Sequence, residues 1–114
     1  MNNRDLQIIS HICLHCKEAI GFIKRFGDDY KLFVSDRAYF NAVAMSILQI
    51  GELANALSDE YRESTKNEIP WNMVRGMRNA LAHGYSSIDA DVLWQTAKND
   101  IPMLFDFCDS QITK

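Results

Sequence analysis

The sequence is poor in residues that break helices and in residues that bind metals. It has 2 prolines, 5 glycines, 3 cysteines and 3 histidines in 114 residues. The odd number of cysteines and the lack of an export signal predict reduced thiols and a cytoplasmic protein. Positive charge is also scarce, with 12 Lys and Arg against 15 Asp and Glu. This net charge of −3 excludes a protein that coats nucleic acid through a generally basic surface.

An unbroken apolar run long enough to cross a membrane is lacking too. The nearest candidate, residues 38–57, is interrupted by Asn41, Gln49, Glu52 and Asn55, and a carboxylate is costly in lipid. We therefore expect this stretch to be a core helix. With 47% hydrophobic and 24% charged residues, the composition predicts a folded domain, and the length predicts a single one over residues 1–114.

Apolar residues recur at alternating steps of three and four in four segments, which predicts amphipathic helices. The first is expected at about residues 3–26, and the second runs from a cap at Ser35 or Asp36 to Leu57. On the first, the inward stripe is expected to be Leu6, Ile9, Cys13, Cys16, Ile20 and Ile23. On the second, it is expected to be Phe40, Val43, Ile47, Ile50, Ala54 and Leu57, widened by Met45, Leu48 and Leu53.

A third helix is expected to begin at Pro70 and Trp71 and to end at Gly84. A fourth starts from a cap at Ser87 or Asp89, and its expected inward positions are Val92, Ala97, Ile101, Leu104, Cys108 and Ile112. Pro102 is expected to kink the fourth helix.

No segment alternates with the period of two that a strand needs, so the fold is predicted to be all-α. Residues 58–69 are polar and have room for one short helical turn. Short connections between amphipathic helices favour an up-down bundle of four to five helices. Since the helices are broadly apolar for so small a bundle, we expect an uncovered apolar face and a symmetric homodimer.

A group of metal-ligand residue types occurs on the first helix, at His11, Cys13, His15 and Cys16. On a helix the two histidines lie on the polar side and the two cysteines on the apolar side, so the four cannot converge on one ion. Core cysteines and surface histidines are expected. A two-ligand site of His11 and His15, with Glu18, is the alternative. The sequence predicts no bound metal and no other cofactor.

Polar and titratable residues gather at the predicted end of the third helix, where Arg78, Asn79, His83 and Tyr85 lie within one short segment. Arg78 and His83 are about 140° apart around the helix axis, so a long arginine can share a cleft with the histidine. The carbonyl end of the helix favours a protonated imidazole. A helix-capping histidine beside a solvated arginine fits the same spacing, so the pattern alone leaves both interpretations open.

The sequence RNALAHGY at residues 78–85 resembles the R-x-x-x-x-H-x-Y signature of the HEPN superfamily and, within it, of HepT-like ribonuclease toxins. Three further motifs match in order and spacing: IGE at residues 50–52, PW at residues 70–71, and DADVLW followed by NDIP within residues 89–102. The resemblance covers about residues 35–108, whereas the first helix matches only in pattern.

The resemblance implies a HEPN-like bundle and a metal-independent endoribonuclease that acts as a homodimer, with both signature motifs lining one cleft. Attack of a ribose 2′-hydroxyl on the adjacent phosphate needs a proton acceptor, a proton donor and a cation. His83 would transfer the proton and Arg78 would neutralise the developing charge, while Asn79 and Arg75 would orient the RNA. One chain offers one suitable histidine, and a dimer offers two.

Two further residues have expected roles. Glu52 either faces solvent or holds Arg75 or Arg78 in place, because a carboxylate on a mostly apolar helix needs a partner. The resemblance also implies a type VII-like toxin–antitoxin pair, in which a partner MntA-like nucleotidyltransferase transfers adenylate from ATP to Tyr85 and silences the ribonuclease. The structural alternative for Tyr85 is a ring packed against the helix end with its hydroxyl in water.

Two other classes of protein fit the same sequence. One is a non-catalytic helical module that binds a nucleotide or substrate beside a minimal nucleotidyltransferase, and the other is a plain dimeric interaction domain. The complete signature favours the enzyme, because a scaffold has no need for Arg, His and Tyr at one helix end. The acidic pI favours the two modules, because ribonucleases gain affinity from a basic surface.

Overall fold

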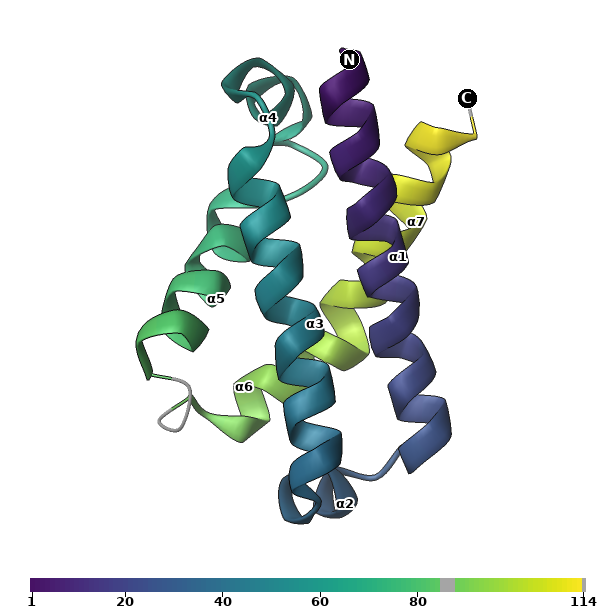
Figure 1. The fold of residues 1–114 in the computed structure, drawn as a ribbon, viewed down its shortest axis with the longest axis vertical. Helices are drawn as coiled ribbons and strands as arrows, with labels where there is room; N and C mark the ends of the chain where they lie inside the picture. Colours follow the sequence, from purple (N-terminus) through teal and green to yellow (C-terminus); the bar gives the residue numbers. More distant parts are fainter. Residues whose placement is uncertain (85–87, 114) are drawn as a thin grey trace.

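The computed structural model describes residues 1–84 and 88–113, and every regular element among them is a helix (Figure 1). The longer elements are α1 (Asn3–Phe26), α3 (Arg37–Ala56), α5 (Trp71–Gly84) and a C-terminal run of α6 (Ala90–Gln95), η2 (Thr96–Asp100) and α7 (Ile101–Ile112). The short ones are α2 (Tyr30–Ser35), which was not predicted, and α4 (Asp59–Thr65), which is the predicted turn in the polar connection. The all-α prediction is confirmed.

Side-chain caps determine where the long helices begin. Asn2, Asp36 and Asp89 each accept a hydrogen bond from a backbone N–H in the first turn of α1, α3 and α6, respectively. Asp36 rather than Ser35 caps α3, because Ser35 is the last residue of α2. At the other end of α1, Gly27 has a φ of 119°, a backbone conformation that glycine adopts without strain.

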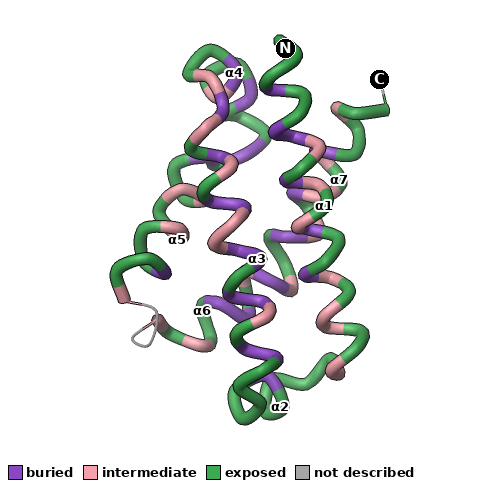
Figure 2. Tube along the Cα trace, viewed as in Figure 1, coloured by how far each residue is buried: buried purple, intermediate pink, exposed green. Residues whose placement is uncertain are grey.

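The core lies where α1, α3 and the C-terminal run meet, and α5 packs against the outer side of α3 (Figure 1). Buried positions follow the facing sides of these helices (Figure 2). All six inward positions expected on α3 are buried: Phe40, Val43, Ile47, Ile50, Ala54 and Leu57. Met45, which was expected to widen that stripe, is instead 51% exposed. None of the helices in the described part of the chain combines the length and hydropathy of a membrane span.

The buried face of α1 differs from the prediction. Its buried residues are Asp5, Ile8, Ile9, Ile12, Cys16 and Ala19, whereas Leu6 is 38% exposed and Cys13 only partly buried. The physical reason is that α1 contacts α3 on one side and α7 on the other, and the buried face is the one between them. Asp5 belongs to it because its carboxylate accepts hydrogen bonds from the Ser58 backbone N–H at 2.9 Å and from Ser58 Oγ at 2.7 Å.

The C-terminal run is irregular just before Pro102, where a kink was predicted. Residues 96–100 form the π-helical turn η2, and Pro102 follows in the first turn of α7. Because proline has no N–H to donate to the preceding turn, the α-helical hydrogen-bond pattern is interrupted there. Four of the six residues expected to face inward are buried: Ala97, Ile101, Leu104 and Cys108. The other two, Val92 and Ile112, are 47% and 38% exposed.

Candidate active site

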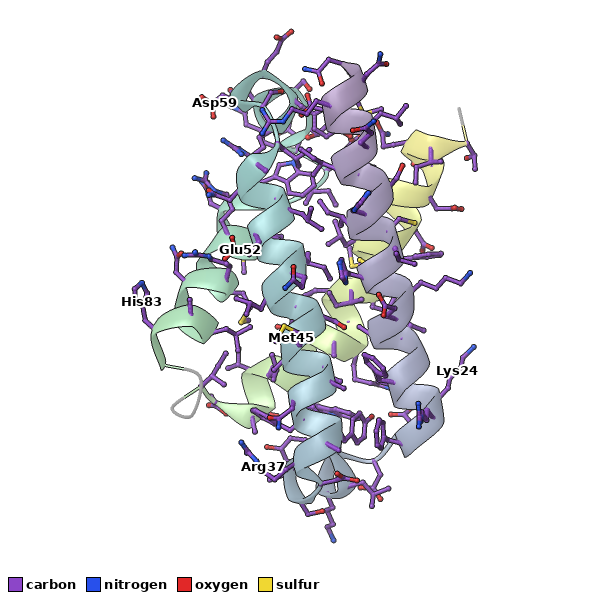
Figure 3. The ribbon with its side chains drawn as sticks, in the orientation of Figure 1. Lys24, Arg37, Met45, Glu52, Asp59 and His83 are labelled. Carbon is purple, nitrogen blue, oxygen red and sulfur yellow. The ribbon has the colours of Figure 1, made fainter. Side chains whose placement is uncertain are left out.

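The arginine of the RNALAHGY segment is held in place by α3. Arg78 Nε donates to Glu52 Oε1 at 2.5 Å, and Arg78 Nη1 donates to Asn79 Oδ1 at 3.0 Å. The Arg78 and Glu52 side chains are 33% and 46% exposed, so solvent reaches the pair. Glu52 lies on the side of α3 that faces α5 (Figure 3). Arg75 and Arg78 were the two predicted partners of Glu52, and its carboxylate contacts Arg78.

Gly51 allows α3 and α5 to come this close. A Cβ at position 51 would lie 2.3 Å from Arg78 Cβ and 3.1 Å from Arg78 Cα, which is far below contact distance for carbon atoms. Any side chain at this position would therefore push the two helices apart. The neighbouring residues of the IGE motif thus have different functions in the structure: Gly51 sets the helix spacing and Glu52 binds the guanidinium.

A second arginine is held in the same way one turn earlier on α5. Arg75 Nε donates to Asn55 Oδ1 at 3.0 Å. Asn55 lies three residues after Glu52 and Arg75 three residues before Arg78, so the antiparallel helices make two successive contacts of the same kind. The partner of Arg75 is neutral, and no ion pair found among residues 1–84 and 88–113 includes Arg75. The charge of Arg75 is therefore not compensated by a carboxylate.

These side chains line a pocket of about 190 Å³ at the surface of α3 and α5. Its lining residues are Asn55, Asn72, Arg75, Gly76, Arg78 and Asn79. Every side chain in this set is an amide or a guanidinium, apart from the glycine, and none is acidic. In a chain with a net charge of −3, this lining makes the pocket locally cationic, and guanidinium and amide groups of this kind can bind an anion.

His83 lies beyond the edge of this pocket. Asn72, Gly76, Asn79 and His83 follow one another at steps of four, three and four, so they share one face of α5. His83 is exposed in the last turn of the helix and points away from the bundle (Figure 3). The structure thus brings Glu52, Arg75, Arg78 and Asn79 together and leaves His83 apart from them. Tyr85 lies outside the described residues.

The histidines and cysteines of α1 are divided between surface and core. His11 is exposed, and His15 Nδ1 lies 3.4 Å from Glu18 Oε1 at the surface. Cys16 is fully buried and Cys13 partly so, and burial raises the pKa of both thiols, which keeps them protonated. Across the described ranges, no three His, Cys, Asp or Glu side chains come together as metal ligands would.

Sequence reasoning does not single out Asn55 and Asn72 as site residues. Asn55 is one of the polar residues that interrupt the apolar stretch 38–57, but only the tertiary contact with Arg75 shows what it faces. A signal for Asn72 is present in the sequence, because its spacing to Gly76, Asn79 and His83 repeats along one helix face. From the sequence alone, this spacing cannot be distinguished from that of an ordinary solvent-exposed helix face.

The fold and the site define a helical HEPN-like domain that has a cationic surface pocket on α5 and, outside this pocket, an exposed histidine on the same helix. The chain belongs to the HepT-like ribonuclease family, whose pattern, described as "Ribonuclease HepT-like", matches residues 16–110. The resemblance inferred from residues 35–108 is thereby confirmed, and the match extends into α1.

Individual relatives agree with the family. The chain is 31% identical over 105 residues to "Putative RNase MJ1380" of Methanocaldococcus jannaschii. The aligned region covers 91% of this chain and 94% of that protein. It is 35% identical over 89 residues to "Probable ribonuclease HepT" of Thermococcus cleftensis, and this aligned region covers 76% of this chain and 80% of that protein. No solved structure matches the chain. The family and these names support ribonuclease activity.

Proposed function

We propose that the chain is a metal-independent endoribonuclease toxin that cuts RNA by attack of a ribose 2′-hydroxyl on the adjacent phosphate. The observation that supports this best is the anchored guanidinium of Arg78. Its Nε is held by Glu52 at 2.5 Å and its Nη1 by Asn79 at 3.0 Å, and no other group among residues 1–84 and 88–113 forms a hydrogen bond with this guanidinium. Nη2 and the second hydrogen of Nη1 can therefore bind a ligand. A guanidinium fixed in this way stabilises a crowded, negatively charged phosphorane without having to reorganise.

The other site residues have complementary roles in this proposal. His83 transfers the proton, as general base to the 2′-hydroxyl or as general acid to the leaving oxygen. His83 lies in the last turn of α5, where it is exposed. Asn79 and Arg75 orient the RNA backbone. Glu52 positions Arg78 and does not touch the substrate.

The active form in this proposal is a homodimer. Only 2 of the 14 residues of α5 are buried, Trp71 and Leu81, and Met73 is 72% exposed. A groove of about 490 Å³ runs beside this helix, lined by Gly76, Met77, Ala80, Gly84, Ile88, Asp89 and Val92. A second copy that covers this largely apolar groove would bring its own outward-pointing His83 to the site, and the reaction would then have one proton acceptor and one donor.

Cleavage of RNA in the presence of EDTA tests the chemistry. We expect Arg78→Ala and His83→Ala each to lower kcat/KM by roughly a hundredfold or more, whereas Arg25→Ala, which removes an exposed arginine from the far end of α1, leaves it unchanged. Activity that disappears with EDTA and returns with a divalent metal would overturn the mechanism. Mixing inactive Arg78→Ala and His83→Ala subunits tests the shared site, because mixed dimers regain activity only if one cleft uses residues of both chains.

Control of the enzyme is the second part of the proposal. A cognate MntA-like nucleotidyltransferase adds adenylate to Tyr85, two residues after His83 in the sequence. The added adenylate carries a negatively charged phosphate, which in this proposal competes with the RNA backbone and repels it. Intact-mass spectrometry after incubation with the partner, ATP and Mg²⁺ tests this step. A mass gain that is absent in the wild type, or equally present in Tyr85→Phe, would show that this tyrosine is not the switch.

One observation favours the alternative of a non-catalytic nucleotide-binding module. His83 is not part of the pocket that Arg75, Arg78 and Asn79 line, so this pocket can bind a nucleotide without proton transfer. In that case the wild type binds nucleotide, cuts no RNA, and binds equally well as His83→Ala. The ribonuclease proposal expects cleavage by the wild type under the same conditions.

A further inference from the structure

We propose that the pocket on α5 binds a second phosphate group of the RNA, next to the phosphate that is cut, with Arg75 as its principal ligand. The proposal deepens the proposed function and rests on it. The ligand class is an oligoribonucleotide that carries at least one phosphate besides the scissile one, either a further phosphodiester or a terminal phosphate monoester.

The two arginines are anchored to α3 in the same way. Both Arg75 and Arg78 donate Nε to a side chain of α3, to Asn55 and Glu52, respectively, and both arginines line the pocket. Residues three apart on a helix have Cβ atoms about 5–6 Å from each other. Two anchored guanidinium groups at this spacing form adjacent phosphate sites along one helix.

The residues that anchor the two arginines differ in charge. Glu52 offsets the charge of Arg78 directly, whereas Asn55 holds Arg75 without offsetting its charge. An arginine beside a carboxylate suits the phosphate at which negative charge develops during the reaction, since the pair is already fixed. Arg75 has the uncompensated charge and therefore attracts a phosphate that stays singly or doubly negative throughout.

A glycine, Gly76, forms part of the wall of the pocket. A Cβ at Gly76 would meet no atom of this chain within 4 Å, so packing within the chain does not require glycine there. Glycine weakens a helix interior. The absence of a side chain at this point of the pocket wall lets a phosphate or ribose approach the helix backbone. The amides of Asn55, Asn72 and Asn79 around it offer donors to the same ligand.

Binding of short 2′-deoxy dinucleotides tests the second phosphate site, because they lack the attacking hydroxyl and stay intact. A dinucleoside monophosphate is compared with the same molecule carrying a 5′-phosphate or a 3′-phosphate, and Kd is measured by isothermal titration calorimetry. We expect one of the two added phosphates to tighten binding to the wild type by tenfold or more, the size of one charge-assisted hydrogen-bonded contact.

Three variants test whether the pocket causes the tighter binding of the molecule with the added phosphate. The quantity compared is the Kd of the dinucleoside monophosphate divided by the Kd of the same molecule with the added phosphate. In Arg75→Gln this ratio falls to about one. Asn55→Asp keeps an oxygen acceptor for Arg75 Nε but offsets its charge, so it lowers the ratio as well. The matched control, Arg25→Gln, removes the same charge far from the pocket and keeps the ratio of the wild type.

The outcomes separate this inference from the function on which it rests. A wild-type ratio of one, or a ratio that survives Arg75→Gln, overturns the second phosphate site even if the same preparation cuts RNA. A ratio that depends on Arg75 in a preparation that cuts no RNA overturns the ribonuclease and leaves an oligonucleotide-binding pocket.

Discussion

Replacing Gly51 with alanine perturbs the contact that brings Arg78 to α3. The added Cβ would lie 2.3 Å from Arg78 Cβ, whereas carbon atoms in contact are about 3.5–4.0 Å apart. The obstructing atoms are Cβ and Cα of Arg78, which cannot rotate out of the way. We therefore expect α5 to move away from α3 by roughly 1 Å or more.

Two opposing effects determine the change in stability. Alanine is favoured over glycine in a helix interior by about 1 kcal/mol. Overpacking costs about 1–3 kcal/mol, and the upper end applies here because rigid atoms collide. The free energy of unfolding should thus fall by about 2 kcal/mol. The displacement also draws Arg78 Nε away from Glu52, so RNA cleavage should fall by about tenfold, the value of one charge-assisted hydrogen bond.

Gly21→Ala is the matched control. Gly21 is exposed in the interior of α1, and a Cβ there would meet no atom within 4 Å. The same substitution should therefore raise the free energy of unfolding by about 1 kcal/mol and leave cleavage unchanged. Urea unfolding followed by circular dichroism measures both variants. A Gly51→Ala protein as stable as Gly21→Ala would refute the close contact of the two helices.

Three further predictions concern single contacts. Asp5→Ala removes the buried acceptor of both Ser58 hydrogen bonds and should lower the free energy of unfolding by about 2–3 kcal/mol in urea titrations; a loss below 1 kcal/mol would contradict the reasoning. Burial, with nearby aspartates, raises the pKa of Tyr39 to about 12. Above pH 10 or thereabouts the unfolded chain therefore loses a proton that the native state keeps, and stability should fall as the pH rises toward 12, less steeply in Tyr39→Phe. Glu52→Ala frees the Arg78 guanidinium and should lower kcat/KM for RNA cleavage by about tenfold. Glu52→Gln retains an oxygen acceptor and should lower kcat/KM by less. Equal losses of kcat/KM in the two variants would argue against a positioning role.

The helices and much of the core follow from the sequence alone. The boundaries of α1, a cap of α3 at Ser35 or Asp36 and most of the buried face of α3 are local properties, because apolar periodicity and capping act within a few residues. Family membership follows as well, since the RNALAHGY segment and the IGE motif can be recognised without knowledge of what they contact.

The tertiary structure decided which partner each polar residue meets. Glu52 contacts Arg78 while Asn55 contacts Arg75, because the close approach at Gly51 sets the register of α3 against α5. The buried face of α1 likewise depends on two neighbouring helices, and so it includes Asp5, which an apolar stripe cannot predict. Helical periodicity fixes which residues share a face, but the packing of one helix on another determines what that face touches.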